Sequence, residues 1–347
     1  MKYLAPQRPN GGVFDVVAFG AKNDGSADAT AAFQAAWDAA NTYSSANVNA
    51  MLLIPPGEYL LQERITAKAN VVVSAYGAYI YGGTNFTSGQ GNIMVNVTSG
   101  SGYAGGTDNV TIMGGIWDAK GQTATTDQTR NIFTVSNCRN WRFLDCTFRN
   151  VPTWHAIDAN AIDGMEVRGC RFEGFEDTTS GGTRFFSEAI QLDTGTDGTP
   201  CKNVRVSDCY MGPAVDGSGL GGFGKLVGSH NPTVANTDFH SAIRVVNNTI
   251  IDAQDSGIAF YDTTEAVVAN NLIKDAAVYG ILFYGNVSGV SNRISVTGNS
   301  IEGAGTRSIF FDGASGQEFR NCVVSSNTCE PSPTSTQATI DVDRWIG

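Results

Sequence analysis

The segment ISVTGNSI at residues 294–301 carries a pattern that recurs through the second half of the chain. Related copies are IRVVNNTI at 243–250 and VVANNLI at 267–273, and earlier copies carry Cys in place of the second Asn. The register residues, one per copy, are Cys146, Cys170, Cys209, Asn248, Asn271, Asn299 and Asn327. Their intervals of 23 to 28 residues fit one coil of a β-solenoid, in which each strand pairs with its copies above and below. Two intervals of 39 residues fit either one coil with a large insertion or nearly two coils.

A second short strand follows the register residue at a nearly constant distance. Its apolar positions are Ile157, Ile190, Ile258, Ile281 and Ile309, where Ile190 fits only if residues 176–185 are an insertion. Short β-branched strands and 41 glycines predict an all-β protein, a single parallel β-helix. We interpret the register residues as an internal stack of small side chains at a bend, in preference to disulfides or a metal site.

The N-terminal part has a different pattern. Residues 14–21 predict a strand, and Asp28 can cap a helix over residues 29–40. Phe33 and Trp37 lie on one face of this helix, which would cover the open end of the solenoid. Residues 52–60 predict a strand, a proline turn and a second strand. We therefore expect an N-terminal segment with a capping α-helix at 1–48, the β-helix at 49–335 and a C-terminal tail at 336–347.

The segments FDVVAFGAKNDGSADATAAFQAAWDAA at 14–40 and LLIPPGEYLL at 52–61, followed by these coils, resemble the pectate-lyase-like superfamily. The resemblance implies a right-handed parallel β-helix. Its members include polygalacturonase-type hydrolases, polysaccharide lyases, epimerases and phage tailspike depolymerases. For this chain it implies a polysaccharide as partner, a place among phage tail proteins and, on the tailspike model, a homotrimer, with a monomer left open as the alternative.

Composition excludes other classes of protein. A net charge of −11 argues against a nucleic-acid partner, which would need clustered Lys and Arg. No apolar run approaches the ~20 residues that cross a membrane. Residues 1–12 contain no secretory signal, so we expect an extracellular or virion location reached by another route, or a removed export segment.

Polar residues on one exposed face of the second strand form the candidate site. If the isoleucines point inward, residues one and three positions later point outward. The first outward column is Asp158, Gln191, Ala259, Leu282 and Phe310, and the second is Asn160, Asp193, Tyr261, Tyr284 and Asp312. Carboxylates for acid–base chemistry and rings that stack on sugars favour a glycan groove. Tyr261 and Tyr284 fit a sugar platform and simple packing equally well, and Asp312 fits a solvated surface position better.

His155 and Glu188 precede these strands, at a turn from which side chains can lean into the groove. His230 falls in the column of Asp193, next to Ser229, if Val227 takes the inward position. These residues predict a polysaccharide depolymerase, with hydrolysis preferred over a lyase reaction. Non-catalytic glycan binding by a structural tail protein is the alternative.

The enzyme hypothesis assigns a role to each candidate residue. Asp193 and Glu188 would be the acid–base pair, and Asp158 would raise the pKa of the acid. His230 and His155 would orient the sugar or hold the carboxylates. Gln191, Asn160, Tyr261, Tyr284, Ser229 and Asp312 would bind substrate. We expect no cofactor, unless the substrate is a polyuronate cleaved by a lyase that uses Ca²⁺.

Overall fold

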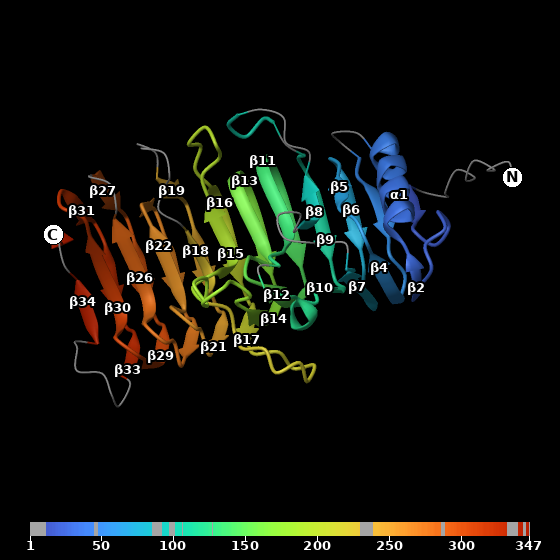
Figure 1. Ribbon diagram of the computed structural model, residues 1–347. Coiled ribbons are helices and arrows are strands. Elements are labelled where there is room, and N and C mark those ends of the chain that lie inside the picture. The colour runs from blue at the N-terminus through green and yellow to red at the C-terminus, as the bar shows by residue number, and fades with distance from the viewer. Residues whose placement is uncertain are drawn as a thin grey trace, which may run out of the picture.

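The computed structural model describes residues 12–44, 48–84, 92–96, 101–105, 107–126, 128–229, 239–285, 289–331, 339–342 and 345–346. Strands of successive coils pair in parallel and stack along one axis, with α1 (Thr30–Tyr43) at one end and β34 (Ile340–Val342) near the other (Figure 1). The all-β parallel β-helix with one helix is therefore confirmed.

The largest sheet has 21 strands and contains two strips. They join where the long strands β11 (Asn131–Leu144) and β13 (Ile157–Arg168) run from one to the other. The first strip adds β5 (Ile65–Ala67), β8 (Asn92–Asn96), β15 (Glu188–Asp193), β18 (Lys225–Ser229), β22 (Ile258–Tyr261), β26 (Tyr279–Gly285), β30 (Arg307–Gly313) and β34. The second strip adds β1 (Val13–Asp15), β3 (Ala50–Leu53), β6 (Val71–Ser74), β9 (Val110–Met113), β16 (Lys202–Ser207), β20 (Arg244–Val246), β24 (Val267–Ala269), β28 (Ser295–Thr297) and β32 (Val323–Ser325). Two short strands, β19 (His240–Ser241) and β23 (Thr263–Thr264), pair at the corner between the strips.

A second sheet of eleven strands closes each coil. Its members are β2 (Asp24–Asp28), β4 (Gly57–Leu61), β7 (Ala78–Gly82), β10 (Ile116–Asp118), β12 (Thr147–Pro152), β14 (Arg171–Glu176), β17 (Tyr210–Gly212), β21 (Thr249–Ile251), β25 (Leu272–Lys274), β29 (Ser300–Ala304) and β33 (Thr328–Pro331). The third sheet contains β27 (Gly289–Asn292), β31 (Gln317–Arg320) and β35 (Trp345–Ile346). The short 3-10 helix η1 (Gly121–Thr123) lies in the connection from β10 to β11.

The pairing resolves the long intervals in the sequence. Val167 pairs with Val206, and Val206 pairs with Val245, so each interval of 39 residues is one coil with an insertion. Much of the added length lies in residues 177–187 and 213–224, which connect the eleven-stranded sheet to the first strip. The solenoid also starts before the expected boundary at residue 49, because β1 and β2 pair with β3 and β4. At the other end β34 pairs with β30, beyond the expected boundary at residue 335.

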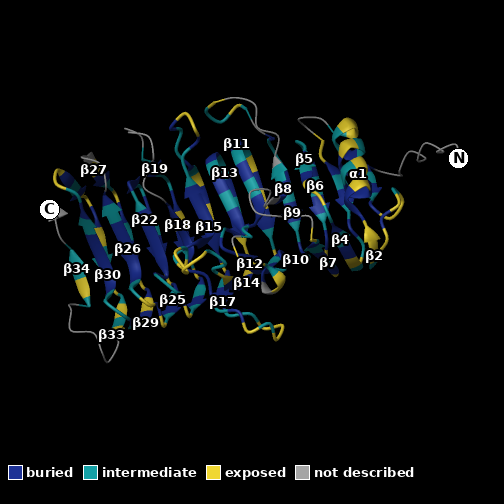
Figure 2. Ribbon diagram, in the orientation of Figure 1, coloured by how far each residue is buried: buried dark blue, intermediate teal, exposed yellow. Residues whose placement is uncertain are grey.

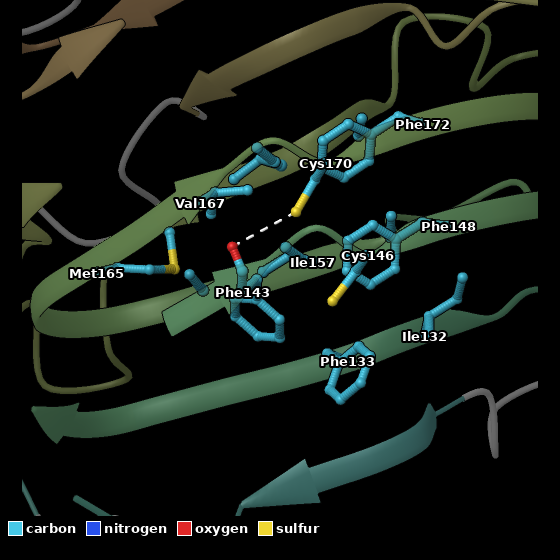
Figure 3. Close-up of a cluster of buried hydrophobic side chains, with 14 of the residues drawn as sticks. Ile132, Phe133, Phe143, Cys146, Phe148, Ile157, Met165, Val167, Cys170 and Phe172 are labelled. Carbon is cyan, nitrogen blue, oxygen red and sulfur yellow. Dashed lines mark hydrogen bonds between the residues drawn. The ribbon is translucent and has the colours of Figure 1, made fainter. Parts of the chain in front are cut away.

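The register residues form the predicted internal stack. Cys170 donates through Sγ to the Phe143 carbonyl oxygen at 3.4 Å, among stacked phenylalanines such as Phe148 and Phe172 (Figure 3). In later coils the Asn271 side-chain nitrogen donates to Asn299 Oδ1 at 2.9 Å, and the same bond joins the other neighbouring pairs of the asparagine ladder. The ladder satisfies polar groups inside the core, and the seven cysteines are all free.

Helix α1 covers the N-terminal end as predicted. Its buried face includes Phe33 and Trp37, and Trp37 Nε1 donates to the Lys68 carbonyl oxygen at 3.1 Å. The helix ends later than expected, and Asp28 accepts from the Thr30 amide at 2.9 Å from one position before the N-cap. The strand predicted over 14–21 is shorter, because the chain turns after Asp15, with Ala18 donating back to its carbonyl oxygen.

Candidate functional site

The two outward columns lie on the first strip in the predicted register. Asp158 pairs with Gln191, and Asn160 pairs with Asp193. Further along, Ala259, Leu282 and Phe310 are in register with each other, as are Tyr261, Tyr284 and Asp312. The structure therefore brings the predicted residues onto one face, with polar side chains in the middle coils and aromatic ones towards the C-terminal end.

Of the three half-buried carboxylates in these columns, Asp158 and Asp193 lie on neighbouring coils, β13 and β15, whereas Asp312 lies on β30. The Asp158 carboxylate accepts hydrogen bonds from the side-chain nitrogens of Asn160 and Asn131, both at 2.9 Å, and from the Thr134 hydroxyl at 3.3 Å. Asp193 accepts from the Thr194 backbone amide at 2.7 Å and from the Gln191 side chain at 3.3 Å. Strand spacing and rise put their Cα atoms about 8 Å apart on the diagonal.

A third column, two residues before the inward isoleucines, holds a buried ionic network. Lys225 Nζ lies 3.3 Å from Glu188 Oε1 and 3.1 Å from Asp255 Oδ2. His155 donates through Nδ1 to the Glu188 carbonyl oxygen at 2.8 Å, and the same nitrogen is 3.6 Å from Glu188 Oε2. Burial alone would lower the pKa of Lys225, but the Glu188 and Asp255 carboxylates raise it above its ordinary value. Tyr261 adjoins this network, and burial raises the pKa of its hydroxyl.

Glu188 is a correction to the sequence interpretation. Its side chain was expected outside the core, yet it is only 1% exposed. The connection 177–187 explains the difference, because Lys225 Nζ donates to the Phe186 carbonyl oxygen at 2.6 Å and fixes that loop beside the network. Figure 2 shows β15 and β18 as largely buried.

Ser229 also differs from its expected role. Ser229 is fully buried and is in register with Leu192, whose side chain points inward. The hydroxyl donates to the Tyr261 carbonyl oxygen and accepts from the Tyr261 amide, so it supports the next strand and does not face the groove. His230 lies outside the described residues.

Sequence reasoning missed Lys225 and Asp255. Lys225 occupies the same column as Glu188, two residues before the inward Val227, so the register alone could have identified it. A glycine-rich segment before it carries no strand pattern, and Asp255 lies in a turn.

Two connections meet beyond the end of β15 that carries Asp193. The Tyr103 hydroxyl donates to the Pro200 carbonyl oxygen at 2.8 Å, and the Gly102 amide donates to Asp197 at 2.7 Å. These contacts tie residues 101–105 to the connection that follows Asp193. The polar coils are thus flanked by the connections at both ends of their first-strip strands.

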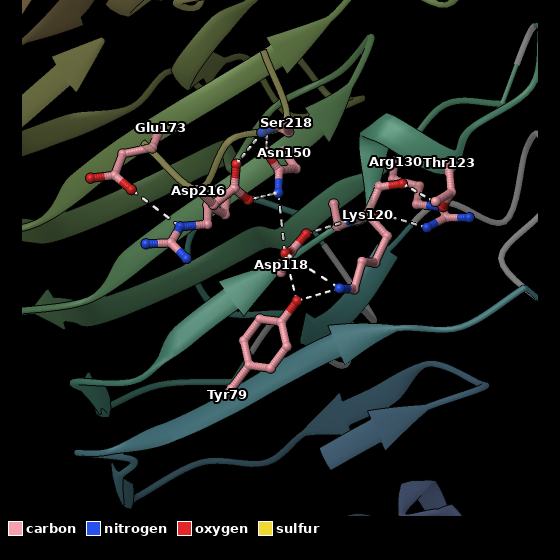
Figure 4. Close-up of polar contacts among 11 residues, drawn as sticks. Tyr79, Asp118, Lys120, Thr123, Arg130, Asn150, Glu173, Asp216 and Ser218 are labelled. Carbon is pink, nitrogen blue, oxygen red and sulfur yellow. Dashed lines mark hydrogen bonds and ion pairs between the residues drawn. The ribbon is translucent and has the colours of Figure 1, made fainter. Parts of the chain in front are cut away.

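A separate polar cluster lies on the eleven-stranded sheet (Figure 4). Asp118 accepts from the Tyr79 hydroxyl at 2.8 Å and from the Lys120 amide at 2.6 Å, and Asn150 donates to both Asp118 and Asp216. Burial raises the pKa of Asp118. Its oxygens accept from the Lys120 amide in the turn and from side chains of neighbouring coils, so Asp118 caps this turn and lies on a different sheet from Asp158 and Asp193.

Near this cluster, the corner connections border a cavity of about 600 Å³. Its lining is rich in hydroxyl groups, with Thr125, Thr178 and Ser218 from three different connections. Across the described part of the chain, no three His, Cys, Asp or Glu side chains are grouped as metal ligands. In the same residues, no helix is both long and apolar enough to cross a membrane.

The fold and the face together define a parallel β-helix protein with carboxylates on an outer face of the first strip. A family model described as a right handed beta helix region matches residues 130–328. This match covers more than half of the chain, so the chain belongs to the right-handed β-helix family. A comparison with curated proteins finds no match in sequence.

Solved structures share the fold at low sequence identity. PfbA, a surface adhesin of Streptococcus pneumoniae, is 20% identical with a TM-score of 0.82, over 94% of this chain and 81% of that one. A hyperthermoactive exopolygalacturonase from Thermotoga maritima is 15% identical with a TM-score of 0.63, over 93% and 81%. A mutant tailspike protein of E. coli bacteriophage HK620, in complex with a pentasaccharide, is 17% identical with a TM-score of 0.56, over 90% and 66%.

Proposed function

We propose that this protein is a polysaccharide depolymerase that hydrolyses glycosidic bonds of an extracellular or host-surface glycan. The observation that carries the proposal is the pair of half-buried carboxylates, Asp158 and Asp193, on neighbouring coils of one face. Glycoside hydrolysis needs two carboxyl groups on either side of the scissile bond. A location at a cell surface or on a virion fits this role, as it does for the adhesin and the tailspike protein.

The burial of Glu188 changes the assignment of roles. A carboxylate that is 1% exposed and paired with Lys225 cannot reach a glycosidic oxygen without breaking that pair. We therefore assign the acid–base pair to Asp158 and Asp193. Glu188 and His155 become positioning residues behind the face, together with Lys225.

In this mechanism, one carboxyl group donates its proton to the oxygen of the leaving sugar as the glycosidic bond breaks. The other carboxylate either accepts a proton from the attacking water or attacks the anomeric carbon itself. Asn160 lies beside the two carboxylates in the register, where its half-buried side-chain amide can bind a sugar hydroxyl group. Gln191 was expected to bind substrate as well, but it is only 6% exposed and its side chain donates to Asp193.

Glycan binding without cleavage is a second candidate, and the environment of Asp158 favours it. Three side-chain donors already point at this carboxylate. Such an arrangement suits a fixed acceptor for sugar hydroxyl groups as well as it suits a proton-transfer group.

The test is release of oligosaccharides from a panel of bacterial capsular, exopolysaccharide and O-antigen preparations. Release should be detected as new reducing ends, and Asp158→Asn and Asp193→Asn should each lower the rate roughly 100-fold or more. Glu302→Gln is the matched control, since Glu302 is an exposed carboxylate on the eleven-stranded sheet. Full activity in both aspartate variants would exclude this pair. Products with a new ultraviolet-absorbing double bond would indicate a lyase, and binding without release would indicate the second candidate.

A further inference from the structure

The first strip changes its chemistry towards the C-terminal end. In β22, β26 and β30 the outward side chains form a hydrophobic cluster separate from the core. Its members are Ala259, Leu282 and Phe310, with Tyr261, Tyr279 and Tyr284 packed against them. The inward side chains of the same strands, such as Phe260 and Phe283, belong to the main core. These six residues therefore form an aromatic platform on the outside of the coil.

The rings of the platform are arranged in two pairs. Tyr261 and Tyr284 have centroids 5.7 Å apart, and Tyr279 and Phe310 have centroids 5.2 Å apart. The three tyrosines are partly exposed, whereas Phe310 is 7% exposed. The tyrosines therefore supply the exposed ring surface of the platform, and the apolar side chains beneath and beside them support it.

Gln191 pairs with Gly228 and Gly228 pairs with Ala259, so the platform lies further along the face that carries the carboxylates. Tyr261 and Tyr284 occupy the column of Asp193, and Phe310 occupies the column of Asp158. At a ladder spacing of 4.8 Å, Tyr284 lies about 14 Å from Asp193 along the axis. A polymer lying across the coils at the carboxylates would extend over the platform.

The charged residues of this face indicate which class of polymer it can bind. Along the described strands of the first strip, with β11 and β13 counted only over residues 131–136 and 157–160, Lys225 and Arg307 are the cationic residues, against five carboxylates. Lys225 is paired with Glu188 and Asp255, and Arg307 is paired with Asp341 at 2.7 Å while stacking on Phe310. Both cations are already neutralised by carboxylates. A polyanion on these strands would therefore meet aromatic rings and surplus negative charge.

We propose that the aromatic platform binds the uncharged sugar rings of a glycan chain whose scissile bond lies at Asp158 and Asp193. The inference rests on the proposed function for the position of the scissile bond, but ring binding by the platform does not depend on cleavage. A second copy of the chain fits the platform less well. A stable protein interface uses about 20–30 residues a side, whereas the platform has six.

The experiment is affinity electrophoresis of the full chain carrying Asp193→Asn, so that binding is measured without degradation. The native gels contain a neutral β-glucan, a neutral galactan, a polymer of N-acetylated amino sugars or polygalacturonate. At least one neutral polymer should retard the protein, and polygalacturonate should not. Tyr279→Ala and Tyr284→Ala should each weaken that retardation roughly tenfold.

Two matched variants keep the result specific. Tyr284→Phe retains the ring and should retain binding. Tyr76→Ala removes a ring that is 51% exposed outside the platform, and it should have no effect. Circular dichroism and light scattering on each variant check the fold and the oligomeric state.

The outcomes separate this inference from the proposed function. Undiminished retardation of both alanine variants, retardation by polygalacturonate alone, or none by any neutral polymer would overturn the platform. An altered oligomeric state in both variants would instead identify a protein contact. Retardation lost in the variants, with no release of sugar by the unmodified protein, would support the platform and refute hydrolysis.

Discussion

The buried pair of Lys225 and Glu188 should control the stability of the middle coils. The two side chains are 5% and 1% exposed, and their charged atoms are 3.3 Å apart. Lys225→Met would leave the Glu188 carboxylate buried beside His155 without its cation. Removal of one partner of a buried ion pair costs about 3–5 kcal/mol, because the remaining charge has lost its compensation. We expect that loss in the free energy of unfolding.

The double variant Glu188→Gln with Lys225→Met should recover most of this loss. It removes both buried charges, and replacement of a buried pair by neutral groups is often close to neutral. Asp255 remains, but its side chain is 20% exposed and can be hydrated. Glu188→Gln alone should cost less than Lys225→Met, since Lys225 keeps Asp255 as a partner.

The assay is equilibrium unfolding in urea, followed by tryptophan fluorescence at pH 7. The matched control is Lys274→Met, which breaks the Lys274–Glu302 pair. That pair is shorter, at 2.8 Å, but its side chains are 41% and 52% exposed, so we expect no measurable change. The pKa of Lys225 is raised in the folded protein, so its contribution is fully present below about pH 10 and is lost as the pH rises further. Equal effects of Lys225→Met and Lys274→Met would refute the reasoning.

Two further predictions concern other buried polar groups. Burial lowers the pKa of His240 to about 4 from 6.5, and its Nδ1 accepts from the Cys201 amide at 3.0 Å. The unfolded chain binds a proton that the folded ring does not, so stability should fall by about 3 kcal/mol between pH 7 and pH 4. His240→Gln should show a smaller fall in urea titrations at the two pH values, and an identical fall would contradict this account. Asn271→Ala should lower the urea midpoint more than Asn327→Ala, since Asn271 has ladder neighbours on both sides and buried groups would lose their partners. Equal urea midpoints for the two variants would mean that the second ladder neighbour of Asn271 adds nothing to stability.

The sequence predicted the parts of this protein that repeat. Each coil repeats an inward apolar residue on its first-strip strand, and alternation along that strand then determines which neighbours face outward. That is why Asp158, Asn160, Gln191 and Asp193 were placed correctly relative to each other. The same alternation applied to Ser229 would have shown that it faces inward with Leu192.

The parts that do not repeat could not be predicted in the same way. The burial of Glu188 depends on residues 177–187, whose path is set by contacts such as that between Lys225 and Phe186. No periodicity carries that information, because a connection folds against side chains from other coils. A column therefore indicates a direction from the sheet, but it does not indicate exposure.

The difference between the repeating strands and the non-repeating connections has a consequence for function in the family. The ladder fixes the positions of Asp158 and Asp193 through backbone pairing, whereas the connections decide how much of each side chain a glycan can reach. Connections can lengthen at the corners without changing the register, as the two coils of 39 residues show. A low sequence identity to other β-helix proteins is therefore compatible with one scaffold and different substrates. In this chain Lys225 and Arg307 are paired beside surplus carboxylates and tyrosine rings, and these features together favour an uncharged glycan.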